Sequence, residues 1–344
     1  MHKVIFEVQA TTPLFLAGAD QNSAELRAPT LRGLMRYWQR ALVGAMVGTD
    51  AEGLEYIQQT ESATFGATKR SSAIVIKVSA PSHRAVKFTE KISVRRGEKR
   101  LTTGKGYLLW SMKSHGRPER GNFKPARWYF PAGTRFQVIL AARDTNSQQL
   151  KQAIAAFWLL TQLGGIGSRS RRCAGSLSAQ AISNTLPDLP VFPFEQAEHA
   201  YALKQQLEQG IKKAREVNGI IAHAIHEARF DILARTTCRI WILQDEQPWK
   251  SEEGAMKVIG ERMQEYRSRI SIEQRKIFGL PLPNITPDRR RASPLHLRIA
   301  ELRQHRYVGV AVLFKTIGGD VRIKDYKIIE RWIDQFSGRV EVEL

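Results

Sequence analysis

The sequence predicts an α+β fold made of two similar halves, each with the element order βαββαβ. Alternating apolar strands and helices with apolar residues at three- and four-residue spacing recur in this order in both halves. A local sequence repeat supports duplication. Both copies run from Phe-Gly through basic and small residues into a predicted strand: "FGATKRSSAIVIKV" from Phe65 and "FGLPLPNITPDRRRASPLHLRI" from Phe278. With 344 residues, the chain has room for about two domains. This order is the ferredoxin-like plan, which RRM-type sheets share.

The first half begins with an alternating strand and an amphipathic helix. Its predicted elements are, in order, strand 2–10, helix 30–47, strand 73–80, strand 134–142, helix 147–163 and strand 176–182. We expect the first helix to pack on the sheet through Leu31, Leu34, Met35, Trp38 and Leu42. The second helix carries Leu150, Ile154, Phe157 and Trp158 on one side.

The second half repeats the order with a shorter chain. Its predicted elements are strand 236–243, helix 252–271, strand 293–302, strand 306–315, helix 324–336 and strand 339–344. In "SPLHLRIAEL", Leu295, Leu297 and Ile299 lie on one face, with His296 and Arg298 on the other. The last helix places Ile329, Trp332, Ile333 and Phe336 at helical spacing.

A proline-punctuated stretch, "LPDLPVFPFEQ", separates the two halves. We therefore predict an N-terminal domain at 1–185 and a C-terminal domain at 235–344. The first domain carries a basic insertion at about 84–127 and a glycine-rich loop at 164–175. Residues 186–234 are predicted as a helical linker or insertion, helical over about 195–232, with Gly210 and Gly219 as possible interruptions.

The net charge of +20 is extreme for this length and indicates a polyanionic partner. Residues 1–185 hold 27 basic and 11 acidic residues, and 84–127 alone hold 13 and 3. The insertion is either a solvated, disordered loop or a loop that faces nucleic acid. The second interpretation is favoured by the aromatic residues in or beside it, which offer stacking platforms for bases: Tyr107, Trp110, Trp128 and Tyr129.

The first helix carries a second stripe, formed by Arg32, Arg36 and Arg40. These arginines are either solvated charges or phosphate ligands. No Asp or Glu within the helix is spaced to pair with them, which favours phosphate. Gly33, in the same helix, costs about 1 kcal/mol relative to Ala, and we take it to mark the close approach of a ligand backbone or a partner subunit.

The segment "LGGIGSRSRRCAGSL" at 163–177 follows the second helix of the first half. Gly164 or Gly165 is expected to cap that helix. The segment fits neither a P-loop nor a dinucleotide fingerprint. It is then either a flexible connector or an anion-binding loop, in which Arg169, Arg171 and Arg172 supply charge beside exposed backbone N–H groups.

Several classes of protein are disfavoured. No run of 18 apolar residues predicts a membrane span, and the N-terminus does not read as a signal peptide. Cys173 and Cys238 are too few for a disulfide framework or a zinc site, so we expect a reducing, cytoplasmic setting, with no cofactor. His223 and His226 lie one helical turn apart but match no metal motif, so ordinary helix surface is the preferred interpretation.

Residues 12–42, "TPLFLAGADQNSAELRAPTLRGLMRYWQRAL", followed by the glycine-rich loop, resemble the RAMP superfamily of CRISPR proteins. The resemblance covers 1–182 and is to non-cleaving subunits of type III-B (Cmr) RNA-targeting complexes. Cys173 and Ala174 stand where the family pattern has a glycine and an aromatic residue. The resemblance implies paired ferredoxin-like folds and packing against other Cmr-type RAMP subunits. It also implies binding of CRISPR guide RNA near its 3′ end, or of the guide–target RNA duplex, and the basic insertion matches by analogy a thumb that wedges between bases.

The resemblance also raises an enzymatic alternative. Asp20 matches the position of the catalytic aspartate in RNA-cleaving RAMP subunits, where a carboxylate positions a metal-bound water or the attacking 2′-hydroxyl. The other interpretation of Asp20 is a loop residue that accepts local backbone hydrogen bonds. A guide-processing endoribonuclease would instead need a histidine base, and His2, His83 and His115 lie outside the glycine-rich loop. A purely structural scaffold is the third class.

We therefore predict a non-catalytic RNA-binding subunit whose sequence specificity comes from base pairing between guide and target. The predicted RNA-binding residues lie in or just before the first helix, just before strand 73–80, in the basic insertion and in the glycine-rich loop: Arg27, Arg32, Arg36, Arg40, Lys69, Arg70, Arg95, Arg96, Lys105, Gly164, Gly165, Gly167, Ser168, Arg169, Ser170, Arg171 and Arg172.

Overall fold

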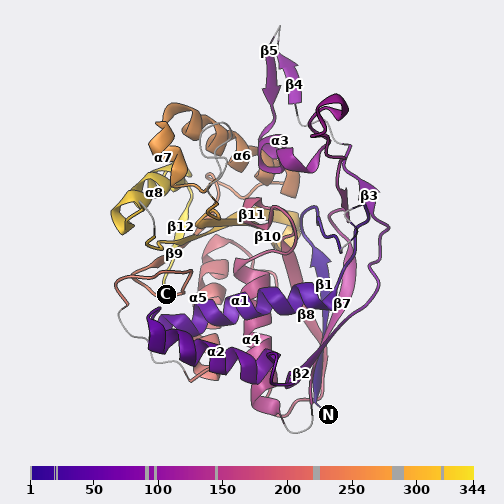
Figure 1. Cartoon of the computed structure of the whole chain (residues 1–344), viewed down its shortest axis with the longest axis vertical. Coiled ribbons are helices and arrows are strands. Elements are labelled where there is room, and N and C mark those ends of the chain that lie inside the picture. The colour runs from indigo at the N-terminus through magenta and orange to yellow at the C-terminus, as the bar shows by residue number, and fades with distance from the viewer. Residues whose placement is uncertain are drawn as a thin grey trace.

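The computed structural model of the chain describes residues 2–18, 20, 22–89, 93–96, 99–143, 146–219, 225–280, 290–318 and 321–344, with backbone alone over 93–96 and 99–101. Two four-stranded antiparallel sheets organise it, one from each half of the sequence. Helices cover these sheets, as Figure 1 shows. The predicted α+β class with two ferredoxin-like sheets is confirmed.

The N-terminal sheet has the strand order β2-β7-β1-β8, which is the ferredoxin-like order. Its strands are β1 (Lys3–Ala10), β2 (Ile74–Val78), β7 (Arg135–Ala142) and β8 (Leu177–Asn184). Two predicted helices, α1 (Ala28–Val47) and α4 (Ser147–Leu163), lie on it. α4 is buried on all sides rather than on one, because the other half of the molecule also packs against it.

A further helix, α2 (Ala51–Phe65), packs beside α1 and was not predicted. Its sequence is largely polar, with Ile57 and Phe65 as its only buried large apolar side chains, so it has little apolar periodicity. The sequence does contain an N-cap for this helix, Asp50, whose side chain accepts a hydrogen bond from the Gly53 N–H at 2.8 Å. Figure 1 shows α1 and α2 side by side on one face of the molecule.

The C-terminal sheet repeats the same order, β10-β11-β9-β12. Its strands are β9 (Cys238–Leu243), β10 (Leu295–Leu302), β11 (Arg306–Phe314) and β12 (Val340–Val342). The helices α6 (Glu252–Arg269), α7 (Ile272–Lys276) and α8 (Lys327–Ile333) belong to this half, with a short 3₁₀ turn, η5 (Ile323–Tyr326), before α8.

The range predicted as a helical linker contains one described helix, α5 (Ala200–Val217). The prediction of helix over 195–232 is wrong at both ends. Gly210 does not interrupt α5, because it lies where any larger side chain would strike the Trp158 ring of α4. Gly219 does follow the end of the helix, with a left-handed φ of 64°. Residues 225–234 have no helical structure.

The basic insertion is folded over its described residues, so the disordered-loop interpretation is wrong there. It contains β3 (Val86–Lys87), which pairs with β6 (Trp128–Tyr129), the hairpin β4 (Ser93–Arg96) with β5 (Lys99–Thr102), the helix α3 (Gly104–Leu109), and the turns η1 (Trp110–Met112) and η2 (Pro118–Arg120). The hairpin projects beyond the rest of the molecule in Figure 1. α3 packs on α6, so the insertion is anchored to the C-terminal half.

The C-terminal sheet is buried on both faces, which joins the two halves into one body. One face packs with the N-terminal core through Ile240, Val310 and Phe314. The other face packs against α6 and α8 through Leu297 and Leu313. His296 and Arg298 alternate with the leucines of β10 as predicted, but their face is buried against the N-terminal half.

Candidate nucleic-acid interface

A groove of about 820 Å³ runs between α1, α2 and the turn that follows α2. It is lined by Arg32, Arg36 and Arg40 from α1 and by Arg70 from the turn. We call it the basic groove. The i, i+4, i+8 spacing that predicted a stripe thus forms one wall, and Arg70, predicted separately, lies in the same groove.

One carboxylate, Glu61 of α2, lies in the basic groove and pairs with two of its arginines. Arg36 Nε donates to Glu61 Oε1, and Arg40 Nε lies 3.4 Å from Glu61 Oε2. Arg32 donates to the Phe65 carbonyl oxygen at 3.2 Å. Four guanidinium groups therefore face one carboxylate, which leaves a net positive groove. The expectation that the helix arginines lack acidic partners is wrong, because the partner comes from α2.

Burial and neighbouring positive charge change the pKa of one arginine in this groove. Burial, followed by the positive charges of Arg36 and Arg143, lowers the pKa of Arg32 from its ordinary value. An arginine remains protonated at neutral pH even so. An anion that binds between guanidinium groups relieves the repulsion between them. A phosphate can accept two N–H hydrogen bonds from one guanidinium group.

The other predicted cations of the N-terminal half lie outside the groove lining. Lys69 is exposed beside Arg70. Arg27, the N-cap of α1, lies 3.7 Å from Glu25 and is partly exposed. Lys105 of α3 is 2.5 Å from Glu253 of α6. Arg95 and Arg96 belong to β4, and their side chains lie outside the described residues.

The aromatic residues near the insertion divide into two pairs. Trp110 and Trp128 are exposed, at 44% and 37% of their surface. Tyr107 is half-buried and accepts a hydrogen bond from Arg267 at 2.8 Å, while Tyr129 stacks on Phe15 with a centroid separation of 5.1 Å. The two tryptophans therefore keep the exposed faces that base stacking requires, and the two tyrosines are engaged with the protein.

The arginines of the glycine-rich loop all bind groups of the protein, although Arg171 keeps 28% of its side chain exposed. Arg172 is 9% exposed, and its guanidinium donates to Ser293 Oγ at 3.0 Å and to the Phe278 carbonyl oxygen at 3.3 Å. Arg169 donates to the Leu108 carbonyl oxygen at 2.6 Å, and Arg171 donates to Ser293. All three bind groups of the insertion or the C-terminal half, so the loop is a junction between halves.

The backbone of this loop is also used internally. Ile166 N–H donates to the Gly175 carbonyl oxygen at 2.9 Å, and Ser168 N–H donates to Phe15 at 2.8 Å. Gly167 and Gly175 have φ of 85° and 64°, and a Cβ at either would overlap a backbone oxygen. Gly164 caps α4, and Gly165 beside it is buried. Ser168 is exposed and Ser170 half-exposed, so the loop offers solvent a small part of itself.

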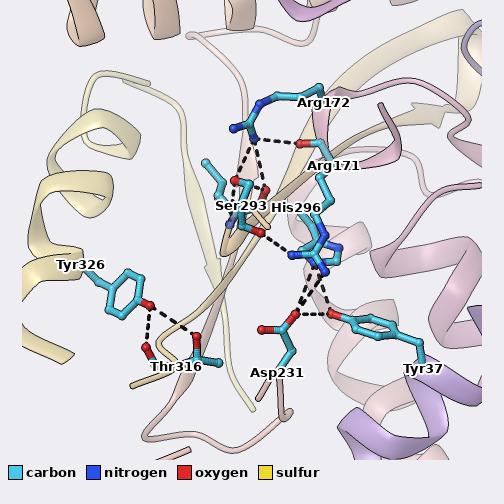
Figure 2. A network of polar contacts seen from close by, with 9 residues as sticks. Tyr37, Arg171, Arg172, Asp231, Ser293, His296, Thr316 and Tyr326 are labelled. Carbon is cyan, nitrogen blue, oxygen red and sulfur yellow. Dashed lines mark hydrogen bonds and ion pairs between the residues drawn. The ribbon is translucent and has the colours of Figure 1, made fainter. Parts of the chain in front are cut away.

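A buried polar network joins α1 to the C-terminal half, as Figure 2 shows. Tyr37 Oη donates to Asp231 Oδ2 at 2.6 Å and lies 3.2 Å from His296 Nε2. Tyr37 has one hydroxyl hydrogen, which Asp231 accepts, so His296 Nε2–H donates to the tyrosine oxygen. Arg171 Nη2 lies 3.4 Å from Asp231 Oδ2. Sequence patterns missed this network because its members come from four separate segments.

The charge states in the network follow from burial and contacts. Burial lowers the pKa of His296 to about 4, so its imidazole is neutral at pH 7. Burial alone would raise the pKa of Asp231, but His296, Arg171 and Tyr37 outweigh it and hold the pKa below its ordinary value. Asp231 is therefore an ionised carboxylate under physiological conditions.

The candidate catalytic residue Asp20 accepts hydrogen bonds from its own loop. Its Oδ1 accepts from the Asn22 N–H at 2.8 Å, and its Oδ2 accepts from the Ser23 hydroxyl at 3.1 Å. The hydrogen bond from Asn22, followed by that from Ser23, lowers the pKa of Asp20. The geometry is that of the local loop interpretation.

The histidines considered for catalysis or metal binding are dispersed. His2, His83 and His115 contact Thr185, Ser82 and Lys113 respectively, and none of these contacts involves the glycine-rich loop. His226 is exposed in a non-helical segment, and His223 lies outside the described residues. Within the described ranges, no three His, Cys, Asp or Glu side chains are grouped to hold a metal ion. None of the described helices is long and apolar enough to cross a bilayer.

The chain is similar in sequence to two proteins of Pyrococcus furiosus. It is 29% identical over 351 residues to CRISPR system Cmr subunit Cmr1-1, covering 98% of this chain and 96% of the relative. It is 29% identical over 198 residues to Cmr subunit Cmr1-2, covering 54% of this chain and 100% of the relative.

Solved structures share the fold. The crystal structure of apo Cmr1 from Pyrococcus furiosus superposes with a TM-score of 0.68 at 24% identity, covering 100% of this chain and 99% of the other. A chain of the cryo-EM structure of the Type III-B Cmr-beta complex bound to cognate target RNA gives 0.59 at 12%, covering 97% and 100%. The RAMP superfamily model matches residues 7–178, half of the sequence, over the sheet and helices that form the basic groove. The chain belongs to the RAMP superfamily.

Proposed function

We propose that this protein is an RNA-binding subunit of a type III-B CRISPR effector complex. It holds the guide RNA near its 3′ end, or the guide–target RNA duplex, by the sugar–phosphate backbone and does not cleave it. The observation that carries the proposal is the basic groove, in which four arginines face the single carboxylate of Glu61. The near-full-length similarity to a Cmr subunit supports the assignment to this kind of complex.

The groove suits a nucleic-acid backbone better than a compact anion. Its arginines are distributed along two turns of α1 and across to the turn after α2, as successive phosphates require. A net positive groove also attracts RNA at long range and releases counterions when phosphates bind. The sequence of the RNA is then read by base pairing, and the protein contributes only backbone contacts.

We propose that the basic insertion extends the RNA-binding surface beyond the basic groove. Trp110 and Trp128 are exposed aromatic rings on an element rich in lysine and arginine. We assign them to stacking against bases next to the strand held by the groove. Arg169 and Arg172 of the glycine-rich loop are left out of the RNA contacts, because their guanidinium groups are bound inside the protein.

Binding without cleavage is the part of the proposal that concerns Asp20. Its two carboxylate oxygens are engaged by Asn22 and Ser23, and these contacts support a structural role in its loop. The proposed partners are guide RNA, target RNA and other Cmr-type RAMP subunits.

The salt dependence of RNA binding tests the groove. We compare the wild-type chain with the triple variant Arg32→Gln, Arg36→Gln and Arg70→Gln, using a labelled single-stranded RNA. Each lost phosphate contact lowers the slope of log Kd against log salt by about 0.7, so the triple variant loses about 2. The matched control replaces Lys212, Lys213 and Arg339 by Gln; none of these residues lines the groove, and we expect the wild-type slope.

A second arm changes the charge in the opposite direction. Glu61→Gln removes the carboxylate that pairs with Arg36 and Arg40, and we expect RNA affinity to rise about two- to fivefold at low salt. Glu55→Gln, on the same helix and exposed, is its control. Equal slopes for the wild type and the triple variant, with no gain from Glu61→Gln, overturn the assignment of the groove. RNA cleavage in Mg²⁺ that Asp20→Ala abolishes overturns the non-catalytic role.

A further inference from the structure

A second cavity, of about 420 Å³, lies where the two halves of the molecule meet. Its walls come from α1 and α2 on one side and from residues 229–231, 291–294 and Thr316 on the other. We call it the junction pocket. Its volume falls in the range of about 300–1,000 Å³ that is usual for small-molecule sites, and the basic groove, at about 820 Å³, is larger.

The junction pocket adjoins the basic groove directly. Arg40, Leu54 and Ile57 line both of them. An RNA strand whose phosphates follow α1 in the basic groove therefore passes beside the junction pocket.

One carboxylate oxygen in the pocket is available to a ligand. Within the described residues, every hydrogen bond and ion pair of Asp231 reaches Oδ2, from Tyr37, Arg171 and His296. The close-up in Figure 2 shows these contacts converging on one oxygen, while the other carries none. Oδ1 accepts no hydrogen bond from any residue within the described ranges. An ionised carboxylate held in a fixed orientation, with one open acceptor, selects a ligand that offers an N–H or O–H.

The rest of the lining defines the class of that ligand. Leu54, Ile57 and Phe230 supply apolar walls, and Pro294 closes one side. Such walls suit a flat ring rather than a hydrated phosphate. The cations Arg40, Arg171, Arg229 and Arg291 outnumber the single carboxylate and disfavour a cationic ligand. The pocket thus combines an open carboxylate oxygen, apolar walls and an excess of cations. A ring with N–H donors and carbonyl or ring-nitrogen acceptors, joined to an anionic backbone, matches each of these.

We propose that the junction pocket receives one nucleobase, turned out of the RNA strand whose phosphates lie in the basic groove. An N–H of the base donates to Asp231 Oδ1, and the apolar walls cover the ring. This inference rests on the proposed function, because the strand must occupy the groove for its base to reach the pocket.

The test separates the base from the backbone. One probe is a labelled 12-unit strand in which every nucleotide is a tetrahydrofuran abasic analogue, and the other carries a single adenine at its centre. Both have the same phosphates. We expect the wild-type chain to bind the adenine-bearing strand roughly tenfold more tightly, because the base adds a hydrogen bond to a charged acceptor and covered ring surface.

Two variants locate that gain. Ala292→Trp fills the pocket from an exposed lining position, and Asp231→Asn removes the charged acceptor. We expect each to bring the two probes within about twofold of one another. Ala80→Trp, an exposed alanine outside the pocket, is the matched control and keeps the tenfold difference. Circular dichroism melting verifies that each variant is folded. If Asp231→Asn does not fold, Ala292→Trp alone decides the result.

The outcomes are distinct. A difference between the probes that Ala292→Trp removes and Ala80→Trp retains supports the pocket. Equal binding of both probes by the wild type, or a difference that survives in Ala292→Trp, overturns the nucleobase proposal and leaves the groove intact. Failure of the all-abasic strand to bind at any salt concentration overturns the groove, and the nucleobase proposal with it.

Discussion

Two buried arginines at the junction between the halves donate to backbone carbonyl oxygens across it. Arg298 of β10 is 2% exposed and donates to the carbonyl oxygens of Gln162 and Leu177 at 2.6 and 2.7 Å. Arg172 does the same in the opposite direction, from the N-terminal half to Phe278 and Leu295. A buried guanidinium is tolerated because several carbonyl oxygens replace its water. These arginines therefore hold the halves together.

His296 makes stability depend on pH in a defined window. Burial lowers its pKa in the folded protein from 6.5 to about 4. Between these values the unfolded chain takes up a proton that the folded protein does not, so stability falls as the pH drops from 6.5 towards 4. We expect a loss of about 2 kcal/mol between pH 7 and pH 5 from this group.

Urea unfolding of the wild type and of His296→Gln at pH 7 and pH 5 measures that loss. The variant lacks the titrating group, so its free energy of unfolding should fall by about 2 kcal/mol less than that of the wild type between pH 7 and pH 5. His83→Gln, which replaces an exposed histidine, is the control and should behave as the wild type. The pKa of Asp231 lies below its ordinary value of 3.8, so this carboxyl titrates below the window. The same pH dependence in the wild type and His296→Gln would contradict the assignment.

At the scale of elements, the basic insertion is fixed by one helix contact. Gly104 of α3 and Gly260 of α6 face each other so closely that a Cβ on either would overlap the backbone of the other helix. Glycine at both positions lets the two backbones touch, and α3 carries Leu108 and Leu109 into the core beneath. This uncharged contact lies beside the ion pair between Lys105 of α3 and Glu253 of α6, and the two together hold the charged insertion on the C-terminal half.

Gly260→Ala tests this contact. The added methyl group has no space, so we expect a loss of about 2 kcal/mol in the free energy of unfolding. Gly33→Ala is the matched control, because a Cβ at Gly33 meets no described atom within 4 Å and the helix should gain about 1 kcal/mol. Both values come from urea titration at pH 7. Effects of the same sign for both variants would contradict the packing. The close approach of a ligand backbone or partner subunit at Gly33 stays a prediction.

At the scale of the whole molecule, the two ferredoxin-like halves share one core. The face of the C-terminal sheet that carries Ile242, Val308 and Val312 belongs to the same apolar cluster as α1 and α4. α5 adds to this by packing on both α4 and β12. We propose that the predicted domains at 1–185 and 235–344 are structural repeats that cannot separate.

This proposal predicts a single unfolding transition for the full chain. Tryptophan fluorescence and far-ultraviolet circular dichroism should give coincident urea curves, because neither half can unfold without exposing the core of the other. A fragment of residues 235–344 should lack native tertiary signal, since one face of its sheet is uncovered. Two separate transitions, or a fragment with native near-ultraviolet dichroism, would show independent domains.

The repeated order of elements and the arginine stripe of α1 were predictable because both depend on local periodicity. Strand alternation and helical spacing are properties of a few neighbouring residues, and they placed Arg32, Arg36 and Arg40 on one helix face. The basic charge of the N-terminal half was visible in the same way, and so were four aromatic residues in or beside the insertion, although not which of them are exposed. These features predict an α+β protein with a strongly basic N-terminal half.

Tertiary structure alone decided which partners the predicted cations bind. Arg36 and Arg171 look alike in sequence, but α2 brings Glu61 to the first, while Asp231 and Ser293 from distant segments bind the second. The junction pocket has the same origin, since its walls come from α1 and α2, from Arg171, and from residues 229–231, 291–294 and 316. Burial and partner choice depend on contacts between residues far apart in sequence, and no local pattern carries that information.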